Sequence, residues 1–126
     1  MGQYLAMNQA APEALISSTA SRAFYTALFI CDGYKIDEGK IRLVPDLFHA
    51  GAGKILEVIK EAPRCERLAI FGHNPGFTSA TNALANANIP NVPTCGVVGI
   101  KFNIETWQEA DFGKGVIDFQ YFPKEI

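Results

Sequence analysis

Apolar residues recur at helical spacing in several stretches of the chain, and each of these stretches predicts a helix. Residues 20–30 place alanine, phenylalanine, leucine and isoleucine about one turn apart, and the pattern stops near residues 32–33. Residues 53–62 repeat the pattern among lysine and glutamate, and Pro63 lies just beyond the expected helix end. Two further helices are expected at residues 3–8 and 77–86.

Short apolar runs separate these helices and predict strands. The expected strands are residues 14–16, 41–44, 68–71, 96–102 and 116–122. Pro45 ends the second of them, and the last two read as a hairpin because Ile117, Phe119 and Tyr121 alternate with polar residues. Strands that alternate with helices and are followed by a hairpin predict an α/β fold, here a three-layer sandwich with a mostly parallel central sheet.

Length and charge limit the classes of protein and partner. The 126 residues are enough for one domain, and an apolar fraction of 48% suits a packed core. A net charge of −2, with 19% charged residues, gives no general attraction to nucleic acid or to anionic lipid. No apolar run approaches the roughly 18 residues of a membrane span. We therefore expect no nucleic-acid and no membrane partner, and an anionic substrate would need a local cluster of positive groups.

The three cysteines and two histidines show no spacing typical of a metal site. The cysteines are odd in number, widely separated and without a Cys-x-x-Cys pair. Free thiols in a reducing compartment, with no metal and no cofactor, are the expectation. The first 14 residues contain no lysine or arginine and no apolar signal-peptide core, so a cytoplasmic protein is expected.

The strongest chemical signal is the sequence Gly-His-Asn-Pro-Gly at residues 72–76, which joins a predicted strand to a predicted helix. In an open α/β sheet, ligands bind beyond the carboxyl ends of the strands. His73 would stand at this edge, and the helix that follows could direct its N–H groups and partial positive charge toward an anion. The alternative is a turn histidine that is satisfied by backbone groups.

A second signal is Arg22, in a segment of hydroxyl residues that again follows a strand and opens a helix. A cation in the first turn of a helix is mildly unfavourable against the helix dipole, so its presence calls for an explanation. A planar guanidinium that binds phosphate oxygens through two hydrogen bonds is one explanation. A solvated surface arginine is the other.

Four segments, in order along the chain, resemble motifs of the SixA-type phosphohistidine phosphatases, which belong to the histidine phosphatase (phosphoglycerate mutase-like) superfamily. Residues 17–27 are similar to their segment Ser-Ser-Pro-x-x-Arg-Ala-x-x-Thr-Ala, and residues 72–76 to their second histidine motif. Residues 47–50 resemble Leu-Tyr-x-Ala, and residues 93–98 resemble Pro-Thr-Ala-Gly-Val-Ala. Each match is weak alone, but the four together span nearly the whole chain.

The resemblance implies roles for four residues. Arg22 would bind the transferred phosphoryl group, and His73 would contact it and stabilise the transition state. Asn74 would be an accessory polar group at the same rim, and His49 would either line the pocket or hold a structural position at a helix start. The implied activity removes a phosphoryl group from a phosphorylated protein or small phosphorylated substrate, through a phosphohistidine intermediate. No metal is required, because arginines and histidines supply the positive charge.

In this family the nucleophilic histidine follows an arginine on the first strand, and the sequence has no such motif. Neither His49 nor His73 follows an arginine. The first residues resemble the end of the family's first helix. Residues 1–126 are therefore expected to form a histidine phosphatase domain that lacks its N-terminal strand and part of its first helix. Either the real protein is longer, or this is a naturally short relative. The alternative function is a non-catalytic phosphate-binding or scaffold protein, a pseudophosphatase.

The absent strand would lie beside the strands that end at Ser17 and Gly72, so we expect a gap between them. Each unsatisfied buried backbone group costs on the order of 1–3 kcal/mol. The chain would then have to re-pair its strands, form a homo-oligomer in which a neighbour supplies a strand, or carry upstream residues that supply it.

Overall fold

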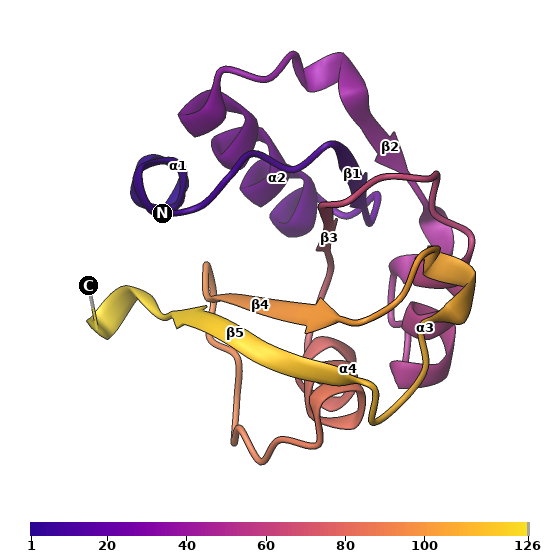
Figure 1. Cartoon of the computed structure of the whole chain (residues 1–126). Coiled ribbons are helices and arrows are strands. Elements are labelled where there is room, and N and C mark those ends of the chain that lie inside the picture. Colours follow the sequence, from indigo (N-terminus) through magenta and orange to yellow (C-terminus); the bar gives the residue numbers. More distant parts are fainter. Residues whose placement is uncertain (126) are drawn as a thin grey trace. The chain divides into compact units, whose positions relative to one another are not determined.

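The computed structural model describes residues 1–125, so Ile126, the last residue of the expected domain, lies outside the described residues. The described chain divides into two compact units (Figure 1). Unit 1 consists of Met1–Phe48 and Cys65–Gly72, and unit 2 consists of the remaining described residues, from His49 to Arg64 and from His73 onward.

Unit 1 is built on a three-stranded parallel sheet in the order β2 (Ile41–Leu43), β1 (Ala14–Ser17), β3 (Leu68–Phe71). The central strand β1 is the most deeply buried, with Leu15 and Ile16 exposed by only 1% and 2%. Helix α2 (Ser21–Tyr34) packs on β1 and β3. Its buried face is formed by Ala23, Ala27, Ile30 and Cys31. The parallel centre expected from the sequence is thus confirmed within this unit.

The expected gap between the strands that end at Ser17 and Gly72 is wrong. β1 pairs directly with β3, in register from Ala14↔Leu68 to Ser17↔Phe71. The backbone N–H of Ser18 extends this pairing by donating to the carbonyl of Phe71, at 2.9 Å. The two apolar strands therefore satisfy each other's backbone groups. β3 is instead an edge strand, because no strand of the described chain pairs with its other side.

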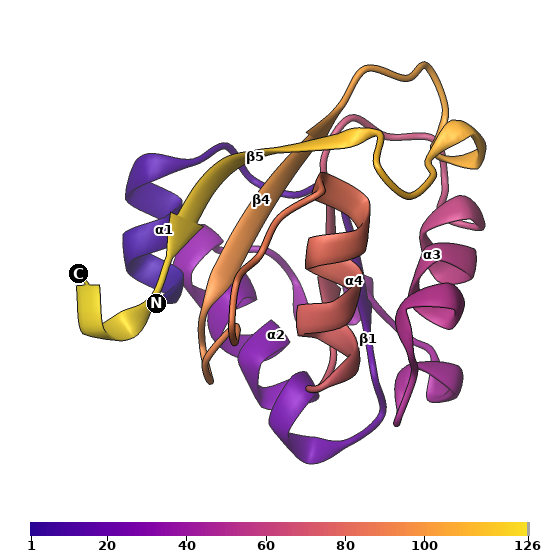
Figure 2. The ribbon, with the colours of Figure 1, turned by 90° about the horizontal axis from the view of Figure 1, so that it is seen from below.

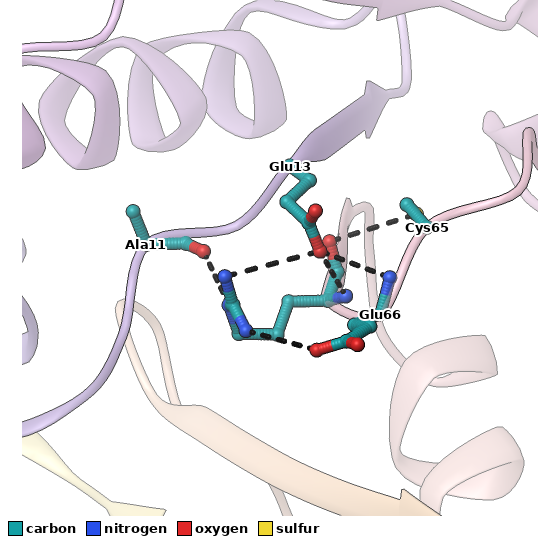
Figure 3. Close-up of polar contacts among 5 residues, drawn as sticks. Ala11, Glu13, Cys65 and Glu66 are labelled. Carbon is teal, nitrogen blue, oxygen red and sulfur yellow. Dashed lines mark hydrogen bonds and ion pairs between the residues drawn. The ribbon is translucent and has the colours of Figure 1, made fainter.

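A cluster around Glu13 and Arg67 joins the N-terminal ends of β1 and β3 (Figure 3). One carboxylate oxygen of Glu13 accepts from the backbone N–H groups of Glu66 and Arg67, at 2.9 and 3.0 Å. The Nε atom of Arg67 donates to the carbonyl of Ala11, at 2.7 Å. The side chains of Glu13 and Arg67 are about half exposed, so their 3.9 Å ion pair adds little. The hydrogen bonds to the backbone fix the register of the two strands.

Helix α2 extends further than the sequence predicts, to Tyr34 rather than to about residue 30. Gly33, which looked like a stop signal, lies inside the last turn, where α1 (Gly2–Asn8) packs against it. A Cβ atom on Gly33 would lie 2.4 Å from the carbonyl carbon of Gly2, so only glycine allows this approach. The Tyr34 hydroxyl lies within hydrogen-bond distance of the carbonyls of Leu5 and Gln9, at 3.1 and 3.0 Å. Gly33 therefore serves helix packing, and the helix ends one residue after it, at Tyr34.

Unit 2 combines two helices with an antiparallel hairpin (Figure 2). Helix α3 (Ala52–Lys60) packs against α4 (Gly76–Ala85), and α4 also contacts the hairpin of β4 (Val97–Phe102) and β5 (Gly115–Tyr121). A register shift between Gly99 and Ile100 bends the hairpin. Trp107 lies edge-on to Phe102, with ring centroids 6.3 Å apart. The hairpin expected from the alternating tail is confirmed.

Short 3₁₀ turns complete the described chain, at Glu38–Lys40, Pro45–Leu47, Trp107–Glu109 and Pro123–Glu125. Among the described residues, none of the helices has both the length and the apolar character that crossing a bilayer demands.

Candidate functional site

The segment that carries Arg22 leaves the carboxyl end of β1 through a buried turn. Ser17 and Ser18 have no exposed surface. The hydroxyl of Ser17 donates to the carbonyl of Ser18 at 2.8 Å, and the hydroxyl of Ser18 accepts from the backbone N–H of Ala20 at 3.2 Å. Both buried hydroxyls are thereby satisfied locally. The turn that they stabilise leads directly into α2 at Ser21.

Arg22 is the second residue of α2, and its side chain is exposed. Its carbonyl accepts a hydrogen bond from the hydroxyl of Thr26, at 3.0 Å, as part of the helix. The first turn of α2 contains no acidic residue. Within the described chain, no carboxylate pairs with the guanidinium of Arg22. The guanidinium therefore keeps its donors for a ligand or for solvent.

His73 lies between the end of β3 and the start of α4, as the sequence predicts. Its ring is half-buried, and its carbonyl accepts from the backbone N–H of Phe77 at 2.9 Å, which begins the helix. The first turn of α4 also contains no acidic residue. Neither helix start therefore carries a negative charge that would repel an anion.

Asn74 has a structural role that the sequence did not show. Its amide nitrogen donates to the side-chain oxygen of Asn91 at 3.0 Å and to the carbonyl of Val92 at 2.7 Å. Its amide oxygen accepts from the backbone N–H and the hydroxyl of Thr78, at 3.1 and 2.7 Å. Asn74 thus joins the start of α4 to the loop before β4. Its expected contact with substrate stays a prediction beside this role.

His49 follows the 3₁₀ turn Pro45–Leu47 and is exposed, with a left-handed backbone at φ +58°. The next residue, Ala50, lies against the start of α4, where its carbonyl oxygen would be 1.8 Å from a Cβ atom on Gly76. Unit 2 therefore brings together the segments that carry His49 and His73. Arg22 belongs to unit 1, and its shared site with His73 stays a prediction.

The sequence reasoning missed Thr78 in this region, and it missed the packing role of Gly76. The hydroxyl of Thr78 donates to the side-chain oxygen of Asn74 and accepts from the backbone N–H of Val92, the latter at 3.0 Å. The one signal for it was a hydroxyl four residues after Asn74, one helical turn away. No sequence signal marked Gly76 as a contact to Ala50. The described residues contain no group of three histidine, cysteine, aspartate or glutamate side chains that could hold a metal ion.

Comparison with known proteins places the fold. No protein-family model and no curated protein matches the sequence, but solved structures do. A protein assigned as phosphohistidine phosphatase SixA from Agrobacterium tumefaciens matches with a TM-score of 0.79 at 18% identity, over 97% of this chain and 75% of that one. The chain has the SixA fold.

Two further SixA structures agree with this assignment. One, assigned as a phosphohistidine phosphatase from Nakamurella multipartitia, has a TM-score of 0.77 at 16% identity, over 97% of this chain and 77% of that one. The other, a protein histidine phosphatase SixA complexed with tungstate, has a TM-score of 0.78 at 15% identity, over 98% and 77%. The α/β fold that the four motifs implied is therefore confirmed as the SixA fold, and at these identities the likeness concerns the fold alone.

Proposed function

We propose that this chain is a phosphatase domain of the phosphohistidine type, in which Arg22 and His73 bind the phosphoryl group. The observation that carries the proposal is the direct pairing of β1 and β3. Both strands point the same way and end in register, at Ser17 and Phe71. The chain leads from these two ends to Arg22 and to His73. In open α/β sheets, this carboxyl edge is where ligands bind.

The chemistry of the two side chains supports an oxyanion as the ligand. The guanidinium of Arg22 presents planar donors that match two phosphate oxygens, and no carboxylate of the described chain neutralises it. The half-buried imidazole of His73 can donate a further hydrogen bond. Because the whole chain carries a net charge of −2, such a local group of donors is needed to hold an anion.

In the proposed reaction, the phosphoryl group moves to a nucleophilic histidine, and water then hydrolyses the phosphohistidine. Arg22 and His73 would stabilise the charge on the phosphoryl oxygens during both steps. By resemblance to the family's Arg-His motif, neither histidine of this chain would be the nucleophile, because neither follows an arginine. The substrate class is a phosphorylated protein or a compact phosphorylated molecule.

A second candidate function is a non-catalytic protein that binds phosphate through Arg22 and His73. Such a pseudophosphatase would keep the binding groups and lack the nucleophile. The two functions share the anion site and differ only in turnover, so one experiment tests the site and another tests catalysis.

Binding of oxyanions tests the site. Inorganic phosphate is one probe, and tungstate, the oxyanion in one SixA complex, is the other. Arg22→Gln and His73→Gln should each weaken binding about tenfold, because each removes a charge-assisted or buried hydrogen bond. Arg64→Gln is the matched control, since it removes an equal charge before β3, at the opposite end of that strand. Equal dissociation constants by calorimetry for all four proteins would contradict the site.

Turnover separates the two functions. The 126-residue chain should release little or no phosphate from a phosphohistidine substrate, because loss of a nucleophile typically costs several orders of magnitude in kcat. Translation of the DNA upstream of Met1 shows whether a strand ending in Arg-His precedes the chain. If it does, the extended protein should turn over and His73→Ala should abolish most of that activity. Robust turnover by the short chain that depends on His49 would contradict the assigned roles.

A further inference from the structure

The two histidines of the chain occupy equivalent places in unit 2. His49 lies three residues before the first residue of α3, and His73 lies three residues before the first residue of α4. These two helices pack against each other. The loop of His49 therefore leads into α3, the loop of His73 leads into α4, and these two helices are in contact.

A close backbone contact joins the two loops. A Cβ atom on Gly76 would lie 1.8 Å from the carbonyl oxygen of Ala50 and 3.0 Å from its carbonyl carbon. Real Cβ atoms do not approach so closely, so the contact exists only because residue 76 has no side chain. Ala50 is bonded to His49, and Gly76 is three residues from His73. The contact thus holds the loop of His49 against the loop of His73.

The backbone of His49 is also held in an uncommon conformation. Its φ of +58° is left-handed, a region that only a few per cent of non-glycine residues adopt. The residue that adopts this conformation is exposed. The nearest cation along the chain, Lys54, forms an ion pair with Glu57 at 2.8 Å on α3.

On the basis of the proposed function, we infer that His49 is a second imidazole of the anion site that His73 borders. The loop held on Gly76 contributes it, and its ring N–H donates a hydrogen bond to an oxygen of the bound phosphoryl group. His49 is then a substrate-binding residue, which decides between the two roles that the sequence left open for it. The ligand that fits is a tetrahedral oxyanion that accepts hydrogen bonds from two imidazoles.

Ring NMR signals test this inference directly, because the chain has only two histidines. The full chain is labelled with ¹³C in its histidine rings and titrated with inorganic phosphate at constant pH. The variants His49→Asn and His73→Asn assign the two signals. We expect phosphate to shift both ring signals with the same dissociation constant. We also expect His49→Asn to weaken binding about fivefold, since one hydrogen bond to a charged group is lost.

Asparagine is the chosen replacement because it tolerates the left-handed backbone of position 49. Asn86→Gly is the control, because it removes a polar side chain from another left-handed position, φ +49°, just beyond the far end of α4, and glycine tolerates that backbone. It should leave phosphate binding unchanged. If phosphate shifts His73 alone and His49→Asn binds normally, the inference is overturned and the proposed function stands. If neither ring signal responds, the proposed function fails and the inference fails with it.

Discussion

At the scale of single residues, Gly76 and Gly53 stand at the starts of two packed helices but have opposite surroundings. A side chain at Gly76 would collide with the carbonyl oxygen of Ala50, whereas one at Gly53 would meet nothing within 4 Å. Gly76→Ala should therefore lower the free energy of unfolding by about 2 kcal/mol, as overpacking does. Gly53→Ala should raise it by about 0.5–1 kcal/mol, because alanine is the better helix former.

Denaturant titration of the two variants and the parent measures these two opposite changes in the free energy of unfolding. If Gly76→Ala were as stable as the parent, the two loops could not be in the contact that the structure shows. Single residues also illustrate which contacts the sequence could not predict. The position of His73 between a strand and a helix was predictable because its motif is local. The two partners of Asn74 are Asn91 and Val92, which lie 17 and 18 residues away and carry no pattern that points to Asn74.

At the scale of elements, the hydrogen bonds of Glu13 link the chain before β1 to the chain before β3. Glu13→Ala removes the acceptor for two backbone N–H groups and should lower the free energy of unfolding by about 1 kcal/mol. Glu13→Gln keeps an acceptor oxygen and should cost less. Glu66→Ala is the control, because that carboxylate is 87% exposed and pairs with Arg67 only at 3.7 Å. A loss as large for Glu66→Ala as for Glu13→Ala would contradict this account of the link.

The elements and the final hairpin were predictable from the sequence, but the direct pairing of β1 with β3 was not. Apolar periodicity located the helices and strands because it reports which face of a segment is buried. It could not report that β1 and β3 pair directly, because residues 14–17 and 68–71 show only short apolar runs that fit any neighbour in a parallel sheet. The end of α2 was misplaced for a related reason, since Gly33 serves a contact with α1 that the local pattern does not contain.

At the scale of the whole molecule, β3 pairs with a described strand on one side only. Phe71 directs its carbonyl to β1, so the alternate residue Ile70 directs its backbone groups to the side that no described strand covers. β3 is apolar along its length. We therefore predict that the 126-residue chain does not remain a monodisperse monomer in light scattering. The amide of Ile16, in the central strand, should exchange far more slowly than that of Ile70. A monodisperse monomer with both amides strongly protected would contradict this prediction.

The contact between Trp107 and Phe102 has a practical consequence for studying the two units. Trp107 is the single tryptophan of the chain and belongs to unit 2. Its fluorescence therefore follows the loss of structure in unit 2 alone, while circular dichroism follows the helices of both units. A denaturation curve recorded by emission coincides with one recorded by ellipticity only when the two units melt in a single cooperative transition.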